Sequence, residues 1–461
     1  MEKTSRREML RNGAILSAGI ASGGTLPAAA RECSSLAGQD SRWDHEYTFG
    51  RTMLFMEEYY RGTMEILGRL SGEIPQIGEL TNRAVSVIKN GGTVWNSANI
   101  GHMPTKEQAE SRRGNPRVMK DHKQQSSKEN KGEMKEGAFA NLKKGDMIFT
   151  NYCNRSLQKA RDRGVYVVSV TVNYVNNKFW PEGYVLPNED GLLLEDVSNE
   201  ILHSHIPHEQ GLVHMPEIPY MAICPSCVTA LGSLYWMLAG EIANKLADRK
   251  AKDVDKSVEY LSILTERVQE IMKAHKGSIR ETAVEMTHRI RDGGRWFVKS
   301  VEHTGFQSEL VRVASGPWMP NTGDWDANKS RNVMLVSGIS PAYPDEVKIA
   351  REKQIEGAFV IGIGPASIDG VVPPGRLIDI ADAGFDSFSP ESGGVISIPG
   401  RKGTFCPTSG ITGNLIQQMI CAQWADEMAR RGSVPFFLMG NYRAGRGFNR
   451  MMQKYAEEQG F

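Results

Sequence analysis

The most constraining feature of the sequence is a segment that occurs twice, 182 positions apart. The first copy spans Ile223–Arg249 and contains Cys224-Pro225-Ser226, and the second spans Phe405–Arg431 and contains Cys406-Pro407-Thr408. Each continues as a long, largely apolar stretch. Proline presets the backbone for a helix start, and Ser or Thr is a common N-cap. Each copy therefore predicts a turn and a buried helix, whose first N–H groups can hold an anion.

The same order of elements leads up to each copy. Both halves begin with a helix that ends in a glycine pair, at Gly91-Gly92 and at Gly293-Gly294. Three runs in each half then predict strands, at 93–96, 147–150, 165–172, 295–299, 333–336 and 358–363. Because strands alternate with helices, we expect an α/β fold with two tandem, doubly wound parallel-sheet domains of the three-layer flavodoxin or Rossmann type, over 50–250 and 257–461. A charged helix over 257–275 links the halves.

Composition and cysteine usage argue against a general nucleic-acid-binding protein, a disulfide-stabilised protein and a metal-binding protein. The chain of 461 residues is 40% hydrophobic with a formal net charge of +1, which is typical of a globular protein and argues against general nucleic-acid binding. Its six cysteines are scattered, so we expect no disulfide framework. Cys224-x-x-Cys227 has no second pair or His at zinc spacing, and we expect no metal site.

Two segments are expected to lie outside the packed domains. Residues 1–30 contain Arg6-Arg7, a modest apolar run and Ala28-Ala29-Ala30, which resembles a twin-arginine signal peptide cleaved near Ala30 and predicts export to the periplasm or the exterior. No later stretch is long and apolar enough to span a membrane. Residues 104–144 carry eleven Lys/Arg against six Asp/Glu and predict a solvated excursion with some helix. A lid over a site is the alternative.

Polar residues collect in the loops after the first and second strands of each half. After the first strands these are Ser97, Asn99, Gly101, His102, Ser300 and His303, and after the second strands Thr150, Asn151, Asn154, Ser337, Gly338, Ser340 and Tyr343. With the glycine pairs and the Cys-Pro helices, this order resembles the sugar isomerase (SIS) domain family in tandem, from about Met53 to Gly460. The C-terminal stretch looks most like bacterial SIS-domain proteins.

The resemblance implies a carbohydrate ligand, either a sugar or a sugar phosphate. In the family a Ser/Thr-rich loop after the second strand holds phosphate. Ser337, Ser340 and Tyr343 around Gly338 match that loop in part, whereas Thr150-Asn151 and Asn154 lack its Ser-Gly core. Thr408 and Ser409, at the start of the second Cys-Pro helix, complete the expected binding set.

Aldose–ketose isomerisation, the reaction that the resemblance implies, needs a base, an acid for ring opening and donors near the developing oxyanion, but no metal or cofactor. The family places a functional Glu just before the Cys-Pro-type helix, where Glu209 and Glu391 stand here. Surface or helix-capping carboxylates are the alternative. His102 and His303, in the first-strand loops of the two halves, are the candidates for ring opening.

Three functions stay open. The leading hypothesis is a cofactor-independent isomerase of a sugar or sugar phosphate, with its site between the two domains. The second is a non-catalytic exported carbohydrate-binding protein, favoured by the incomplete Ser-Gly motif. The third is an amino-sugar lyase or etherase. In each case the partner is a small carbohydrate, and a homodimer stays open because dimers are common for this fold.

Overall fold

The computed structural model describes residues 53–98, 107–122, 138–171, 191–207, 210–219, 221–248, 254–439, 449–451 and 453–454. The predicted signal peptide lies outside these residues, as do four of the candidate site residues. These four are Asn99, Gly101, His102 and Glu209.

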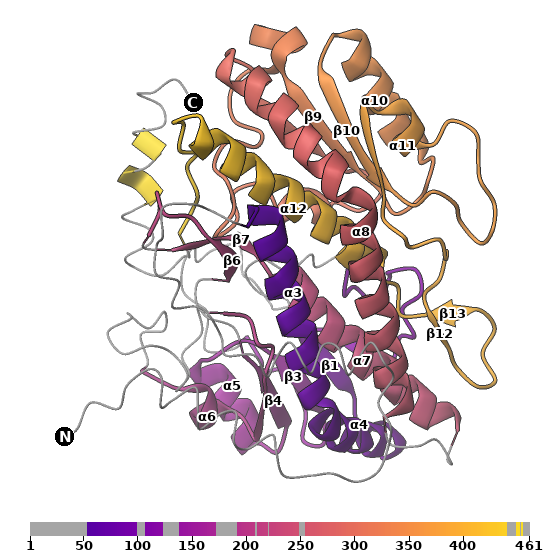
Figure 1. Ribbon diagram of the computed structural model, residues 1–461. Helices are drawn as coiled ribbons and strands as arrows, with labels where there is room; N and C mark the ends of the chain where they lie inside the picture. The colour runs from indigo at the N-terminus through magenta and orange to yellow at the C-terminus, as the bar shows by residue number, and fades with distance from the viewer. Residues whose placement is uncertain are drawn as a thin grey trace.

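The first half folds around a five-stranded parallel sheet. Its strands are β1 (Val94–Ser97), β2 (Lys120–Asp121), β3 (Met147–Thr150), β4 (Tyr166–Val170) and β5 (Glu200–Leu202). They lie in the order β2-β1-β3-β4-β5, with Ser97 opposite Thr150 at the carboxyl ends of β1 and β3. Helices α5 (Arg155–Asp162) and α6 (Leu194–Val197) cover one face, and α4 (Ile74–Lys89) and α7 (Cys227–Ala247) cover the other (Figure 1). This strand order is the flavodoxin-type doubly wound order.

The second half folds around a four-stranded parallel sheet. Its strands are β8 (Trp296–Lys299), β9 (Val333–Ser337), β10 (Phe359–Gly364) and β11 (Ala383–Asp386), in the order β11-β10-β9-β8. On one face, α10 (Pro344–Ile355) and α11 (Leu377–Ile380) enclose a small apolar cluster with Met334, Val336 and Val360. The long helices α8 (Asp255–Arg291) and α12 (Ser409–Arg430) lie on the other face. The predicted α/β fold with two doubly wound parallel sheets is therefore confirmed.

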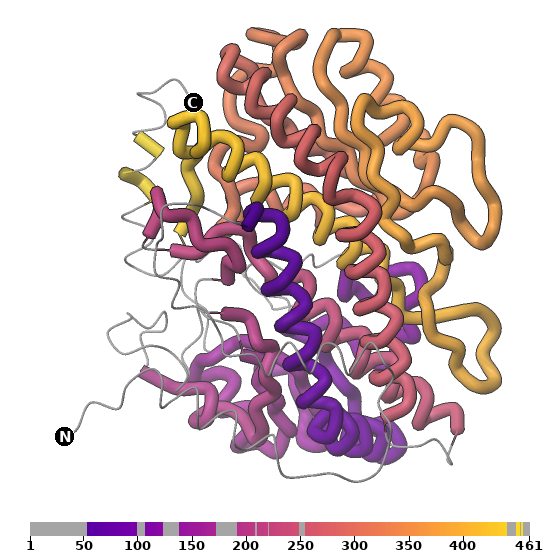
Figure 2. The backbone as a smooth tube through the Cα atoms, viewed as in Figure 1, coloured from indigo at the N-terminus to yellow at the C-terminus, as the bar shows by residue number. Residues whose placement is uncertain are grey.

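A layer of helices between the two sheets joins the halves into one core. Helix α3 (Phe55–Gly72), which precedes the first sheet in sequence, packs against α12, which follows the second sheet. Helix α7 packs against α8 in the same layer. Figure 2 shows the indigo tube of α3 beside the yellow tube of α12. Apart from the small cluster under α10 and α11, most buried apolar residues of both halves form one continuous cluster. The proposed domain boundaries at 50–250 and 257–461 stay a prediction.

Each Cys-Pro turn is held by the opposite half of the chain. Cys224 and Cys406 both adopt a positive φ, of 63° and 62°. The N–H of Cys224 donates to the carbonyl of Ser315 at 2.7 Å, and the N–H of Cys406 donates to the carbonyl of Gly114 at 2.9 Å. Each strained turn is therefore stabilised by a backbone hydrogen bond to the other half of the chain.

Two tyrosines reinforce the same turns. The hydroxyl of Tyr59, on α3, donates to the carbonyl of Pro225 at 2.9 Å. The hydroxyl of Tyr260, on α8, donates to the carbonyl of Pro407 at 3.1 Å. Short antiparallel hairpins lead into both turns, β6–β7 (Gly211–His214 with Ala222–Pro225) and β12–β13 (Ile396–Ser397 with Thr404–Phe405).

Three local predictions were wrong. Ser226 and Thr408 stand at the N-caps of α7 and α12 but make no side-chain capping bond, because their hydroxyls bond elsewhere. The charged helix predicted over 257–275 and the helix predicted before Gly293-Gly294 are one helix of 37 residues, α8. The glycine at its centre, Gly277, costs only about 1 kcal/mol relative to Ala, which packing against α7 and α12 offsets.

The third wrong prediction concerns the described part of the solvated excursion, since residues 104–106 and 123–137 lie outside the described residues. Residues 107–122 are packed between the halves, and Glu107, Gln108, Arg112 and Met119 are buried there. In the part of the chain that the structure describes, no helix combines the length and apolar character needed to cross a membrane.

Candidate functional site

Polar side chains from five distant segments meet at the N-terminus of α12. We call this group the α12 cluster. Its members are Glu107, Arg112, Arg267, His303, Glu391, Thr408 and Ser409, and they are joined by the contacts described below. Four of them, His303, Glu391, Thr408 and Ser409, are candidates from the sequence that the fold brings together.

The centre of the cluster is a buried hydrogen bond between an imidazole and a carboxylate, and it joins the halves. His303 Nε2 lies 2.9 Å from Glu107 Oε2, and the two side chains are 3% and 0% exposed. Glu107 also accepts from Arg112 Nε at 3.3 Å and from Trp236 Nε1 at 3.0 Å. Burial opposes ionisation, but the Arg112 charge and the bonds from His303 and Trp236 outweigh it and lower the pKa of Glu107 to about 2. Glu107 is therefore a carboxylate at neutral pH.

Close packing at the start of α12 fixes the position of Glu107. A Cβ at Gly410 would lie 1.9 Å from Glu107 Oε2, so only glycine leaves room for the carboxylate there. Arg112 Nη2 donates to Ser409 Oγ at 2.8 Å. An anion near the first turn of a helix is also favoured by the helix dipole. The site thus places a carboxylate and a guanidinium side by side at one helix end.

His303 presents its second ring nitrogen without a partner. Among the described residues, no group hydrogen-bonds to its buried Nδ1. The Ser300 hydroxyl donates to the His303 carbonyl at 2.6 Å, and the Phe306 ring lies 5.0 Å from the imidazole. Because the ionised Glu107 accepts the proton of Nε2, a neutral His303 carries its lone pair on Nδ1. That nitrogen has the electronic form of a general base.

Glu391 is engaged in a bidentate ion pair. Arg267 Nη1 and Nη2 reach its two carboxylate oxygens at 2.5 Å and 2.7 Å. The same guanidinium contacts Thr408 Oγ1, which lies 2.8 Å from Ser389 Oγ. Arg267 thus ties the segment around Glu391 to Thr408, directly before α12.

The candidate phosphate loop of the second half lies after β9. Ser337, Gly338 and Ser340 lie in this loop, and Tyr343 stands at the N-cap of α10 without a side-chain capping bond. Glu302, the neighbour of His303, accepts from the N–H groups of Ile339 and Ser340. The loop donors therefore already hold a carboxylate of the chain itself.

The candidate residues of the first half line the carboxyl edge of its sheet. Ser97 and Thr150 are buried at the ends of β1 and β3, and Thr150 Oγ1 accepts from the N–H of Tyr152 at 3.1 Å. Asn151 follows in the same loop, and the side chain of Asn154 caps α5 by accepting from the N–H of Leu157 at 2.9 Å. In the described residues these contacts stabilise the loop.

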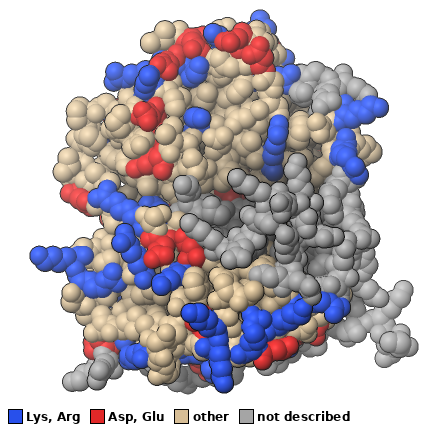
Figure 3. All heavy atoms as spheres, turned by 180° about the vertical axis from the view of Figure 1, so that it is seen from behind, with Lys and Arg blue, Asp and Glu red and all other residues tan. Residues whose placement is uncertain are grey.

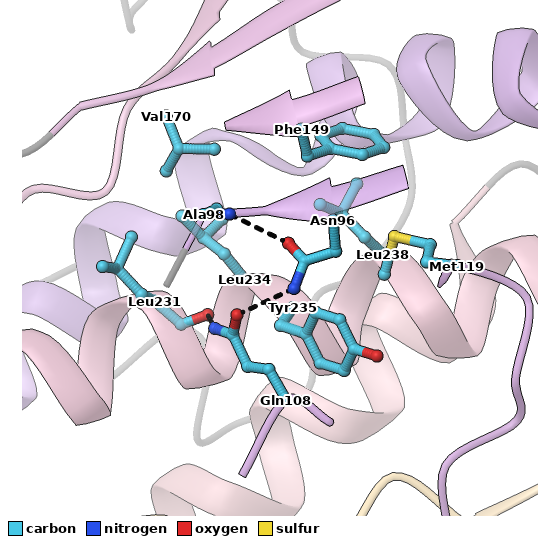
Figure 4. Close-up of a pocket in the computed structure, with 10 residues that line it drawn as sticks. All are labelled: Asn96, Ala98, Gln108, Met119, Phe149, Val170, Leu231, Leu234, Tyr235 and Leu238. Carbon is cyan, nitrogen blue, oxygen red and sulfur yellow. Dashed lines mark hydrogen bonds between the residues drawn. The ribbon is translucent and has the colours of Figure 1, made fainter. Parts of the chain in front are cut away.

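Gln108 connects this edge to the α12 cluster. It accepts from Asn96 Nδ2 at 3.1 Å and donates to the Leu231 carbonyl at 3.0 Å (Figure 4). The cavity beside it has a volume of about 10 Å³, enough for one water at most. A larger surface hollow of about 780 Å³, lined by Arg83, Gly92 and Gly145, lies at the opposite, amino edge of the sheet. Ligands of open α/β sheets bind at the carboxyl edge.

A second buried carboxyl marks the corresponding loop of the other half. Glu309 follows His303 by six residues, as Glu107 follows His102 by five. In contrast to Glu107, both oxygens of Glu309 are buried without a partner in the described chain, and burial raises its pKa well above the usual range. The surroundings thus favour the ionised form of Glu107, whereas burial favours the neutral form of Glu309.

Sequence reasoning missed Glu107, Arg112 and Arg267; the first two lie in the stretch interpreted as solvated, and Arg267 lies in the predicted charged helix. A Glu follows the His of each first-strand loop, after five residues at Glu107 and after six at Glu309, and this similarity is the signal that could have identified both. No comparable signal marks Arg112.

Figure 3 shows Lys/Arg and Asp/Glu interspersed on the described part of the back face, so that face offers no broad patch of one sign.

No family model matches the chain. A protein of Geobacillus thermodenitrificans (strain NG80-2) named UPF0309 protein is 22% identical over 235 residues, which cover 43% of this chain and 94% of that protein. A proposed phosphosugar isomerase from Silicibacter pomeroyi DSS-3 is similar in structure over 83% of this chain and 99% of its own, at 12% identity and a TM-score of 0.45. Tagatose-6-phosphate ketose/aldose isomerase from Escherichia coli is similar over 84% and 97%, at 13% identity and a TM-score of 0.41. These levels of similarity assign no activity to this chain.

Proposed function

We propose that the protein binds a sugar or sugar phosphate beside the α12 cluster and interconverts its aldose and ketose forms without a cofactor. The observation that carries the proposal is the Glu107–His303 pair. An ionised carboxylate holds one nitrogen of a buried imidazole, while the other nitrogen has no partner among the described residues. A carboxylate–imidazole pair of this kind is a general base.

The proposed reaction moves one proton between adjacent carbons. His303 Nδ1 takes the proton from the carbon next to the carbonyl, and the electron pair of that C–H bond forms the enediolate. Glu107 stabilises the imidazolium that results. Arg112 and the first turn of α12 favour the negative charge on the enediolate oxygen. His303 then returns the proton to the former carbonyl carbon. The hydroxyl on the carbon that lost its hydrogen gives its proton to the former carbonyl oxygen and becomes the new carbonyl.

The other catalytic candidates take different places in this proposal. Glu391 is paired with Arg267, which supports a positioning role for it rather than the role of base. Glu209 and His102 lie outside the described residues and stay in the hypothesis as residues for ring opening and proton transfer. Export through the twin-arginine route is likewise part of the proposal, resting on the sequence of residues 1–30 alone.

One observation favours a second candidate, a carbohydrate-binding protein without turnover. Glu302 occupies the donors of the loop after β9, and Arg267 occupies Glu391, so two of the expected catalytic and binding elements are already engaged within the chain. Binding of a sugar without exchange of its carbon-bound hydrogen is the result that separates this candidate from the isomerase.

The test is an isomerase assay of the full chain on a panel of aldoses and aldose phosphates in heavy water. We expect deuterium to enter the carbon next to the carbonyl and the ketose to accumulate. His303→Gln should lower kcat by a factor of about 100 or more while ligand-induced thermal stabilisation stays, because only the base is removed. His275→Gln, a partly buried histidine bonded to the Asp386 carbonyl, is the control. Undiminished turnover in His303→Gln would refute the assignment, and stabilisation without deuterium uptake would favour the second candidate.

A further inference from the structure

The loop after β9 holds an anion that belongs to the protein. Glu302 Oε2 accepts from the N–H of Ile339 at 3.1 Å and from the N–H of Ser340 at 2.8 Å. Glu302 Oε1 accepts from the Ser340 hydroxyl. Successive N–H groups ahead of a helix, here α10, form a nest that binds anions. All three donors that converge on this nest are bonded to one carboxylate.

A second carboxyl lies directly behind the loop. Glu346, on α10, accepts from the N–H groups of Val301 and Glu302, each at 3.1 Å. Its other oxygen packs against Gly338, where a Cβ would lie 2.2 Å away. In the described structure that oxygen has no hydrogen-bond partner, and neither has the buried Ser337 hydroxyl at the start of the loop. The anion nest is thus lined by one bound carboxylate, Glu302, and by one carboxyl oxygen of Glu346 that has no hydrogen-bond partner in the described structure.

We propose that Glu302 is a built-in anion that closes the loop after β9 against phosphate groups and so determines the ligand specificity of the second half. A phosphate needs the same donors, the N–H groups of Ile339 and Ser340 and the Ser340 hydroxyl. It can take them only after the Glu302 carboxylate has left. It would then lie between two acidic side chains, whose field opposes a dianion. A phosphorylated carbohydrate is therefore refused at this loop, whereas neutral sugar hydroxyls face no such repulsion.

This inference does not depend on the proposed isomerase reaction, because it concerns binding. The experiment compares the full chain with Glu302→Ala, using inorganic phosphate as the probe and chloride at equal ionic strength as the reference. Thermal unfolding and calorimetric titration are the readouts. We expect no phosphate-specific shift for the unchanged protein. The midpoint of Glu302→Ala should rise by about 2 °C or more when phosphate is well above its Kd.

Two further variants make the test specific. Glu352→Ala removes an exposed carboxylate from α10 with the same change of net charge, and it should not gain phosphate binding. Adding Ser340→Ala to Glu302→Ala removes the hydroxyl donor and should weaken the gained binding at least several-fold. If Glu302→Ala folds poorly in chloride, phosphate or formate should restore its folding, because either anion replaces the deleted carboxylate.

The inference is overturned by either of two results. One is a Glu302→Ala protein that neither binds phosphate nor is restored by it or by formate. The other is phosphate binding by the unchanged protein that Ser340→Ala abolishes, because the loop would then be open with Glu302 present. A failed isomerase assay would leave both results unaffected.

Discussion

Replacing Glu107 by Gln is expected to destabilise the folded protein at neutral pH by about 3 kcal/mol. The carboxyl is fully buried, and its pKa is about 2 against an ordinary 4.5. Since one pKa unit corresponds to 1.36 kcal/mol, the ionised form is favoured in the folded state by about 3 kcal/mol. Removing one partner of a buried ion pair costs about 3–5 kcal/mol, because Arg112 then keeps an uncompensated charge. The loss of stability obtained from the pKa shift therefore agrees with the loss expected for a broken buried ion pair.

The pH dependence of this loss has a definite sign. A carboxyl with a lowered pKa stabilises the folded state above its unfolded pKa, near 4.5, and the stabilisation disappears as the pH falls through about 2. The difference between the unchanged protein and Glu107→Gln should therefore be constant from about pH 7 to about pH 5. It should shrink steadily below that.

Denaturant unfolding followed by tryptophan fluorescence measures this difference, at several pH values from about 7 to about 3. Glu352→Gln, an exposed carboxylate on α10, is the control and should change the free energy of unfolding by less than about 0.5 kcal/mol. A Glu107→Gln loss that is no larger than that of the control would refute the reasoning. So would a loss of equal size at about pH 3 and about pH 7.

Three further predictions follow from named contacts. Gly410→Ala should destabilise the fold by about 2 kcal/mol or more, because its Cβ would meet the Glu107 carboxylate. A double-mutant cycle should show a smaller loss when Glu107 is replaced by Ala. Glu346, whose pKa burial and Glu302 raise to about 7, destabilises the fold as the pH rises from about 4.5 to about 7, so Glu346→Gln should remove that part of the pH dependence of unfolding. Tyr59→Phe and Tyr260→Phe should each cost about 1–3 kcal/mol in denaturant unfolding, since each leaves a buried proline carbonyl without its donor.

Local sequence signals predicted much of the fold. The sequence predicts the strand at β4 because Val167, Val168 and Val170 are β-branched residues within a short apolar run, which is typical of a strand buried on both faces. The helix predicted before Gly91-Gly92 is α4, and the strands predicted at 147–150 and 333–336 lie in β3 and β9. These features depend on short-range backbone preferences, which a single sequence carries.

The contacts between site residues that are far apart in sequence could not be predicted from such local signals. Glu107 is buried because His303 and Trp236, far away in sequence, supply its partners, and nothing in the polar stretch around it reveals them. Ser340 lies in the loop after β9, and its role as an anion-binding donor stays a prediction. The sequence does not reveal that Glu302 lies on those donors, because that contact depends on how the loops after β8 and β9 meet.

The crossed bonds at the two Cys-Pro turns carry a consequence for how the chain folds. Cys406 bonds to Gly114 and Cys224 to Ser315, and α3 lies against α12, so each half completes the other. Bringing together segments so distant in sequence has a large entropic cost of loop closure. We therefore expect these contacts to form late in folding. We therefore expect slow, cooperative acquisition of the native state after synthesis of the whole chain. Either half expressed alone should expose its apolar helices and aggregate.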